Sequence, residues 1–129
     1  MPSVPGGTHW GGGLWINSHD HALMGRLVLS KGEWNGKRII SESWIDALQT
    51  PCAIRPGSGL LWWLNTDRKY MPNAPESSVF AVGAGKPMVW TEPERNSVSV
   101  TRRYDPAHSH NLLYPTMRVR KPRTPSAHR

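Results

Sequence analysis

The sequence predicts an α+β fold in which an antiparallel sheet of 3–5 strands is flanked by helices. Two observations predict it. Stretches with helical spacing of apolar residues occupy the first part of the chain. They are followed by four short apolar segments, each bounded by turn-forming residues, which are residues 59–65, 80–85, 88–93 and 97–101. A chain of 129 residues is long enough to bury one core.

The first helix is expected from His19 to Leu29. Apolar residues recur there at a spacing of four, and they are Leu23, Met24, Leu27 and Val28. Ser18 is the expected N-cap, because its hydroxyl can accept a hydrogen bond from the first turn. Gly32 stands just past the end, where a left-handed residue commonly stops a helix.

A hairpin and a second helix are expected next. The hairpin is centred on Asn35-Gly36, the dipeptide best suited to a two-residue type I′ turn. Ser41 is then placed to cap a helix that runs to about Gln49. Ile40 before this cap and Ile45 inside the helix have the spacing of a hydrophobic staple.

A short third helix is predicted at 107–114, because Asp105-Pro106 combines an N-cap residue with Pro at the first helical position. Residues 1–117 are therefore assigned to one folded unit. Residues 118–129 are assigned to a disordered basic tail, since they are rich in Pro, Arg and Ser and poor in apolar residues.

The net charge of +7 is concentrated in the last part of the chain. Residues 1–101 hold nine Lys or Arg against eight Asp or Glu, whereas residues 102–129 hold seven against one. This tail suggests polyanion binding, but aromatic residues for base stacking are missing from 118–129, so a solvated end without specific nucleic-acid binding is favoured. No apolar run approaches the ~20 residues of a membrane-spanning helix, so no membrane association is expected.

Other chemistry-bearing residues favour structural roles. His19 and His21 straddle a helix start, where their side chains diverge, so surface or capping roles are favoured over a metal site. Cys52, the only cysteine, has no His-rich neighbourhood in sequence and is expected to be inert. Trp62 and Trp63 point to opposite faces of a strand, and core packing is favoured over a substrate-cleft wall. No cofactor and no metal are predicted.

Several segments occur together in a recognisable order. They are Gly11-Gly-Gly-Leu14 before a capped helix, Gly-Glu-Trp-Asn-Gly-Lys-Arg-Ile-Ile-Ser-Glu-Ser-Trp at 32–44, Leu-Trp-Trp-Leu-Asn at 61–65, Gly-x-Gly at 83–85 and Pro-Glu-Arg at 93–95. Over residues 6–114 this set resembles the C-terminal half of the serine beta-lactamase-related hydrolases. That family includes class C beta-lactamases, penicillin-binding-protein-like esterases and enzymes similar to nylon-oligomer hydrolase. The resemblance implies part of a beta-lactamase/transpeptidase-like fold.

The resemblance also implies which catalytic parts to look for. The family uses a Ser-x-x-Lys motif for its nucleophile and base, and a Tyr-x-Asn loop as a second proton relay. Neither motif occurs in this sequence. In the family both lie in the N-terminal half, so the chain corresponds to a portion without the nucleophile.

A third catalytic element has a counterpart at Gly83-Ala84-Gly85, where the family places a Lys-Thr-Gly or substituted strand. The resemblance implies that the Ala84 N–H is an oxyanion donor and that Gly83 and Gly85 leave room for the acyl group. From the residues alone, the two glycines equally suit a crowded strand bend. Relatives continue with Gly-Gln, whereas this chain has Lys86-Pro87, and Pro87 is limited to an edge or bulge position.

The expected function is therefore that of a fragment of a serine hydrolase. Its parent class would hydrolyse a small-molecule ester, amide or beta-lactam through an acyl-serine intermediate, and the fragment alone is expected to be inactive. Its expected partners are a complementing N-terminal half or further copies of itself, because a partial fold exposes apolar surface. The alternative is a small non-catalytic binding module that uses a Trp-lined sheet face.

Overall fold

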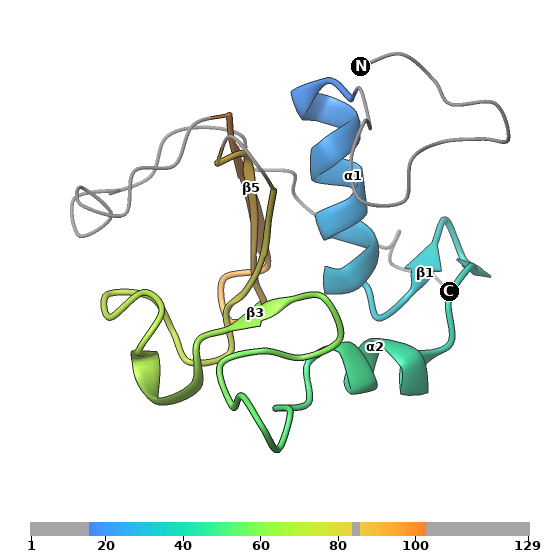
Figure 1. Ribbon diagram of the computed structural model, residues 1–129. Helices are drawn as coiled ribbons and strands as arrows, with labels where there is room; N and C mark the ends of the chain where they lie inside the picture. The colour runs from blue at the N-terminus through green and yellow to red at the C-terminus, as the bar shows by residue number, and fades with distance from the viewer. Residues whose placement is uncertain (1–15, 84–85, 103–129) are drawn as a thin grey trace, which may run out of the picture.

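The protein has an α+β architecture in the computed structural model, which describes residues 16–83 and 86–102. Its larger sheet is antiparallel, and each strand lies beside its neighbour in sequence. The strands are β3 (Trp63–Leu64), β4 (Val79–Val82), β5 (Met88–Glu92) and β6 (Ser97–Thr101). Helix α1 (Ser18–Leu29) lies along one face of this sheet, and α2 (Glu42–Leu48) lies at the foot of α1 (Figure 1). The predicted α+β class and the antiparallel sheet of 3–5 strands are confirmed.

Helix α1 begins one residue earlier than predicted. Its N-cap is Asn17, whose side chain accepts a hydrogen bond from the Asp20 N–H at 2.8 Å. The Asn17 amide in turn donates to the Asp20 carboxylate at 2.8 Å. The expected cap, Ser18, instead accepts a hydrogen bond from the Arg102 Nε at 2.9 Å. Asn17 therefore forms a reciprocal cap, because its amide oxygen accepts from the Asp20 backbone while its amide nitrogen donates to the Asp20 side chain.

Helix α1 ends in a Schellman-type turn. The Gly32 N–H donates to the Leu27 carbonyl at 2.8 Å, and the Lys31 N–H donates to the Val28 carbonyl at 3.0 Å. Lys31 (φ 54°) and Gly32 (φ 84°) are both left-handed. A Cβ at Gly32 would stand 2.2 Å from the Ile40 carbonyl oxygen, so this glycine is required by backbone proximity as well as by φ.

The predicted hairpin and second helix are both present. Strands β1 (Glu33–Trp34) and β2 (Lys37–Arg38) pair around Asn35 (φ 48°) and Gly36 (φ 75°), which is a type I′ turn. In α2 the Ser41 hydroxyl accepts a hydrogen bond from the Trp44 N–H at 3.2 Å, as expected for its N-cap. Ile40 packs against the buried cluster that contains Ile45.

The face of α1 that meets the sheet differs from the predicted apolar stripe. The buried residues of α1 are Ala22, Gly25 and Val28, whereas Met24 is 49% exposed. A Cβ at Gly25 would lie 2.6 Å from Val98 Cγ1, so the helix backbone approaches the sheet closely. Small residues allow this approach, and it lets the sheet valines fill the space that a larger side chain would take.

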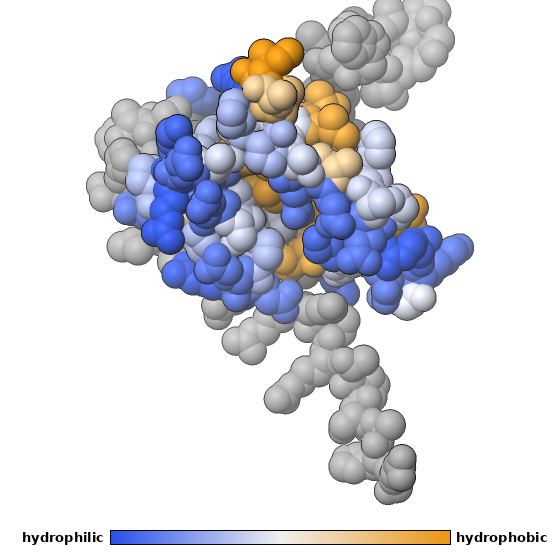
Figure 2. Space-filling model, turned by 90° about the horizontal axis from the view of Figure 1, so that it is seen from below, coloured by the Kyte–Doolittle hydropathy of each residue, from blue (hydrophilic) through white to orange (hydrophobic). Residues whose placement is uncertain are grey.

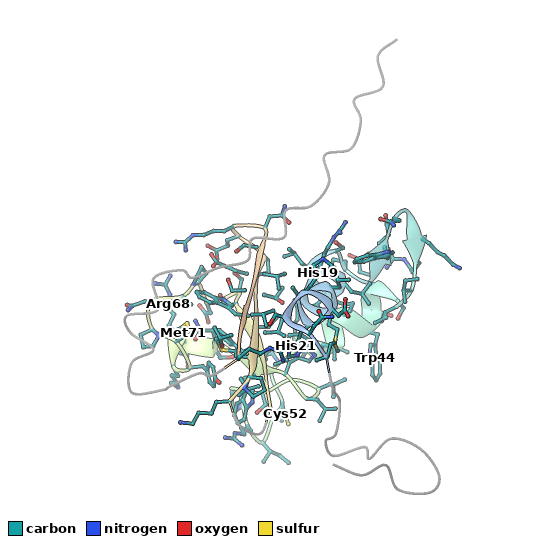
Figure 3. The ribbon with its side chains drawn as sticks, turned by 90° about the horizontal axis from the view of Figure 1, so that it is seen from above. His19, His21, Trp44, Cys52, Arg68 and Met71 are labelled. Carbon is teal, nitrogen blue, oxygen red and sulfur yellow. The ribbon has the colours of Figure 1, made fainter. Side chains whose placement is uncertain are left out.

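The opposite face of the sheet carries a row of aromatic rings. Trp63 pairs with Phe80, and Phe80 pairs with Trp90, so the three residues lie side by side across β3, β4 and β5. Tyr70 stacks on Trp63 with ring centroids 5.7 Å apart. Met71 covers the row from the side opposite to α1 (Figure 3). Phe80 and Trp90 are buried, so these rings form core rather than an open surface.

The two adjacent tryptophans point to opposite faces, as predicted. Trp63 packs against the aromatic cluster, and Trp62 packs against the cluster of Val28 and Ile45 near α2. Both tryptophans are half-buried.

The first sheet strand is much shorter than predicted. Residues 59–62 form a turn in place of a strand, in which the Gly59 N–H donates to the Trp62 carbonyl at 2.9 Å and Leu61 has φ 62°. A Cβ at Gly59 would stand 1.8 Å from the Leu48 carbonyl oxygen. The C-terminal end of α2 therefore holds the backbone of this turn, and only Trp63–Leu64 pairs with β4.

Some expectations fall on residues that the structure does not describe. The third helix at 107–114 and the tail at 118–129 lie outside the described residues, as does the Gly-rich segment at 11–14. Neither α1 nor α2, the α-helices of the described part, has the length and apolar character needed to cross a membrane.

Candidate functional site

The predicted catalytic corner joins β4 to β5. The Gly83 N–H donates to the Pro87 carbonyl at 3.0 Å, and the Lys86 N–H donates to the Gly83 carbonyl at 3.1 Å. Lys86 has φ 62° and is exposed. Pro87 has no N–H to donate to the Gly83 carbonyl. The Lys86 N–H donates to that carbonyl instead, so the proline leaves no hydrogen bond missing at this corner.

Gly83 is exposed at this corner, and a Cβ added to it would lie 3.2 Å from Pro87 Cγ. That contact is tight, so relief of crowding accounts for a small residue at position 83. Ala84 and Gly85 lie outside the described residues, so the direction of the Ala84 N–H stays a prediction.

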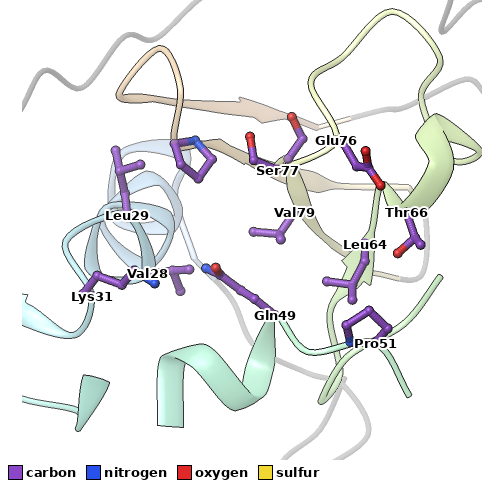
Figure 4. A pocket seen from close by; sticks show the side chains of 12 residues that line it. Val28, Leu29, Lys31, Gln49, Pro51, Leu64, Thr66, Glu76, Ser77 and Val79 are labelled. Atoms are coloured by element: carbon purple, nitrogen blue, oxygen red, sulfur yellow. The ribbon is translucent and has the colours of Figure 1, made fainter. Parts of the chain in front are cut away.

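The structure contains a pocket that the sequence did not indicate. Its volume is about 370 Å³, within the range of small-molecule sites. It lies between the C-terminal ends of α1 and α2 and the loop that precedes β4 (Figure 4). Its apolar walls are Val28, Leu29, Pro51, Leu64, Val79 and Pro93. Its polar lining is Lys31, Gln49, Thr66, Glu76, Ser77 and Ser78.

This pocket and the Gly83 corner are separate. Val79 lines the pocket at the first residue of β4, whereas Gly83 follows the last residue. Four residues of extended chain separate the two by about 13 Å. Gly83, Lys86 and Pro87 do not line the pocket, so the described residues do not join the predicted oxyanion donor to a ligand cavity.

Asn65 holds the loop that forms one wall of the pocket. It is fully buried, and its amide nitrogen donates to the carbonyls of Met71, Ala74 and Pro75 at 3.0, 3.1 and 2.9 Å. Its amide oxygen accepts a hydrogen bond from the Met71 N–H at 2.8 Å. The loop therefore folds around a single side chain. The sequence gives only a polar residue at a strand end, which does not distinguish such a role from a turn.

The titratable residues considered earlier do not assemble into a site. His19 and His21 lie on α1, apart from Cys52, which is exposed in the loop after α2 (Figure 3). Burial, and to a smaller extent the Arg102 guanidinium, lowers the pKa of His21 below its ordinary value of 6.5. Within residues 16–83 and 86–102, no group of three or more His, Cys, Asp or Glu is placed to hold a metal ion.

The two serines that line the pocket also lack the arrangement of an activated nucleophile. Ser77 lines the pocket and donates its hydroxyl hydrogen to Glu94 at 2.9 Å. Ser78 is fully buried, and its hydroxyl has no hydrogen-bond partner among the described residues. Acyl-transfer chemistry needs a hydroxyl next to a base that is itself oriented by a third group, and in the described part neither serine has both.

Comparison with known proteins does not extend this description. No family model matches the chain, no curated protein is significantly similar to it, and no solved structure matches it.

Proposed function

We propose that this chain is the C-terminal portion of a beta-lactamase-related serine hydrolase, in a partial beta-lactamase/transpeptidase-like fold. The parent class would hydrolyse an ester, an amide or a beta-lactam through an acyl-serine intermediate. The chain has neither Ser-x-x-Lys nor Tyr-x-Asn, so it would not turn over substrate by itself. Loss of the nucleophile from such a catalytic unit removes on the order of 10⁶ in rate.

The observation that carries the proposal is the order of elements. Helix α1, the β1–β2 hairpin, α2 and the antiparallel strands β3 to β6 follow one another in the order predicted from the sequence, and this supports the proposal. The Gly83 corner falls between β4 and β5, at the end of a strand that is central in the described sheet. In the proposed role the Ala84 N–H would be the second oxyanion donor, which is a common use of backbone N–H groups at a strand end.

The surface supports the proposed need for a partner. Among the described strands, β6 pairs on one side only, with β5. Large apolar side chains are exposed elsewhere, including Ile54 at 95% and Leu61 at 99%. In the view from below, apolar side chains reach the surface at the top of the picture (Figure 2). An unpaired strand edge and exposed apolar groups suit either a complementing N-terminal half or self-association.

The test is co-expression of this chain with the polypeptide encoded directly upstream of it. We expect that polypeptide to carry Ser-x-x-Lys and Tyr-x-Asn, and we expect the pair, but neither chain alone, to hydrolyse p-nitrophenyl butyrate and to react with a fluorophosphonate probe. Covalent labelling of this chain by itself would contradict the proposal that the serine nucleophile lies on the upstream polypeptide. An upstream polypeptide without both motifs would remove the proposal's basis.

The corner is tested in the same pair. Ala84→Pro removes the N–H that the proposal uses, and it should lower kcat about 10²–10³-fold, as the loss of one oxyanion donor does elsewhere. Ala84→Ser keeps the N–H and serves as the matched control. Equal activity of the two variants would exclude Ala84 as a donor.

A further inference from the structure

The pocket between α1, α2 and the loop before β4 combines an apolar interior with a polar wall that includes Thr66, Glu76 and Ser77. Glu76 and Thr66 lie next to each other on one wall, and α1 contributes Val28 and Leu29 on the other (Figure 4). A ligand that fits must therefore present an apolar body to one side and a polar head to the other.

Two hydroxyl groups on the polar wall, those of Thr66 and Ser77, are already committed as donors. Thr66 Oγ1 donates to the Pro56 carbonyl at 2.8 Å, and Ser77 Oγ donates to the Glu94 carboxylate at 2.9 Å. A carbonyl and a carboxylate only accept, so each hydroxyl hydrogen is used and only oxygen lone pairs remain for a ligand. The head group that these two residues can bind is a hydrogen-bond donor.

The charges around the pocket select a cation. The Glu76 carboxylate accepts a hydrogen bond from the Asp67 N–H at 3.1 Å, and among the described residues it forms no ion pair. Glu94 is not among the lining residues, but its carboxylate lies beside the lining residue Ser77. The cation of the lining, Lys31, forms an ion pair with Asp46 at 2.6 Å. The rim is thus acidic in a chain whose net charge is +7.

One buried hydroxyl beside the pocket lacks a hydrogen bond. Ser78 lines the pocket and is fully buried, yet its hydroxyl has no partner among the described residues. A buried hydroxyl left without a hydrogen bond costs about 1–3 kcal/mol. The Ser78 oxygen is inaccessible from the pocket, so it takes no part in the binding proposed below.

We propose that this pocket binds a small primary amine in its ammonium form, carrying an apolar body such as an aryl or short alkyl group. The three N–H donors of an ammonium match the lone pairs of Thr66 and Ser77 and the carboxylate of Glu76. The apolar walls take the body. Carboxylates and phosphates are disfavoured, because they bring further acceptors and negative charge to a wall that has both.

The experiment uses the full 129-residue chain labelled with ¹⁵N, and NMR titration with phenethylammonium chloride. 2-Phenylethanol and 3-phenylpropanoate present the same ring with a neutral and an anionic head. We expect phenethylammonium to shift the amide signals of Thr66, Ser77 and Val79 and to bind roughly threefold or more tightly than the alcohol, with weaker binding at high salt. Equal binding of all three compounds, or shifts that map away from the pocket, would overturn the proposal.

Variants separate the charge from the shape. Glu76→Gln keeps the oxygen that accepts from Asp67 but removes the charge, and it should weaken amine binding roughly threefold. Glu42→Gln removes an exposed carboxylate outside the pocket and should leave binding unchanged. Equal loss in both variants would show an attraction to net charge rather than a site. None of these outcomes involves the Gly83 corner, so they are independent of the proposed hydrolase ancestry.

Discussion

Asn65 and Met71 are joined by two hydrogen bonds that bridge a turn of the chain. The Asn65 side chain accepts from the Met71 N–H at 2.8 Å and donates to the Met71 carbonyl at 3.0 Å. The Asn65 side chain therefore makes the two hydrogen bonds that a neighbouring strand would otherwise make with the Met71 backbone. It fixes the loop that places Met71 over the aromatic row and Thr66 and Ser77 at the pocket.

Asn65→Ala is expected to be among the most destabilising substitutions in this protein. It would leave the Met71 N–H and up to three carbonyls without their buried partner, at a cost of about 3 kcal/mol in the free energy of unfolding. Urea denaturation followed by tryptophan fluorescence measures it. Asn17→Ala, which removes only an exposed helix cap, should cost about 1 kcal/mol. If Asn65→Ala lowered the free energy of unfolding by less than Asn17→Ala, the proposed role of Asn65 in holding the loop would be refuted.

Gly25→Ala is expected to destabilise the protein even though Ala is the better helix former. The new Cβ would lie 2.6 Å from Val98 Cγ1 and 2.7 Å from Val89 Cγ1. Overpacking of this kind costs about 1–3 kcal/mol, which exceeds the gain of about 1 kcal/mol in helix propensity.

Two further variants test the cause. Gly57→Ala places its Cβ in open space and should be nearly neutral in the same denaturation experiment. Combining Gly25→Ala with Val98→Ala should recover part of the loss, because the truncated side chain makes room. Strict additivity of the two changes would show that the helix and the sheet do not meet as described.

His21 should make the stability depend on pH. Its pKa is lowered in the folded state, first by burial and second by Arg102, so the unfolded chain binds the proton more tightly. Stability should therefore fall as the pH drops below the unfolded value of 6.5 and through the lower folded pKa. His21→Gln should flatten this part of the profile relative to the natural chain. NMR titration of the imidazole checks the direction, and a folded pKa above 6.5 would contradict it.

Leu61→Asn should both stabilise the chain and reduce its self-association. Leu61 is 99% exposed and has φ 62°, a conformation that Asn adopts more readily than Leu. The expected gain in unfolding free energy is about 0.5 kcal/mol. Sedimentation velocity should show less oligomer, since an exposed apolar side chain is removed. Leu61→Val is the contrasting variant, because a β-branched residue is strained at positive φ and should destabilise.

The sequence by itself determined the elements whose signals are local. Asn35-Gly36 specified the type I′ hairpin, and Ser41 specified the start of α2, because turn and cap chemistry act within a few residues. Strands β5 and β6 also lie where their apolar runs and bounding turn residues placed them. The α+β class follows from the order of these elements.

The tertiary structure decided what depends on distant segments. The large apolar residues of α1 predicted a helix but not its buried face, since Gly25 meets the sheet only because valines on β5 and β6 fill the space opposite. The turn at 59–62 shortens β3 because the end of α2 lies against Gly59. The pocket and the Asn65 brace arise in the same way, as carbonyls and side chains from separate segments converge. Packing of this kind depends on which surfaces meet in space, and no short stretch of sequence encodes it.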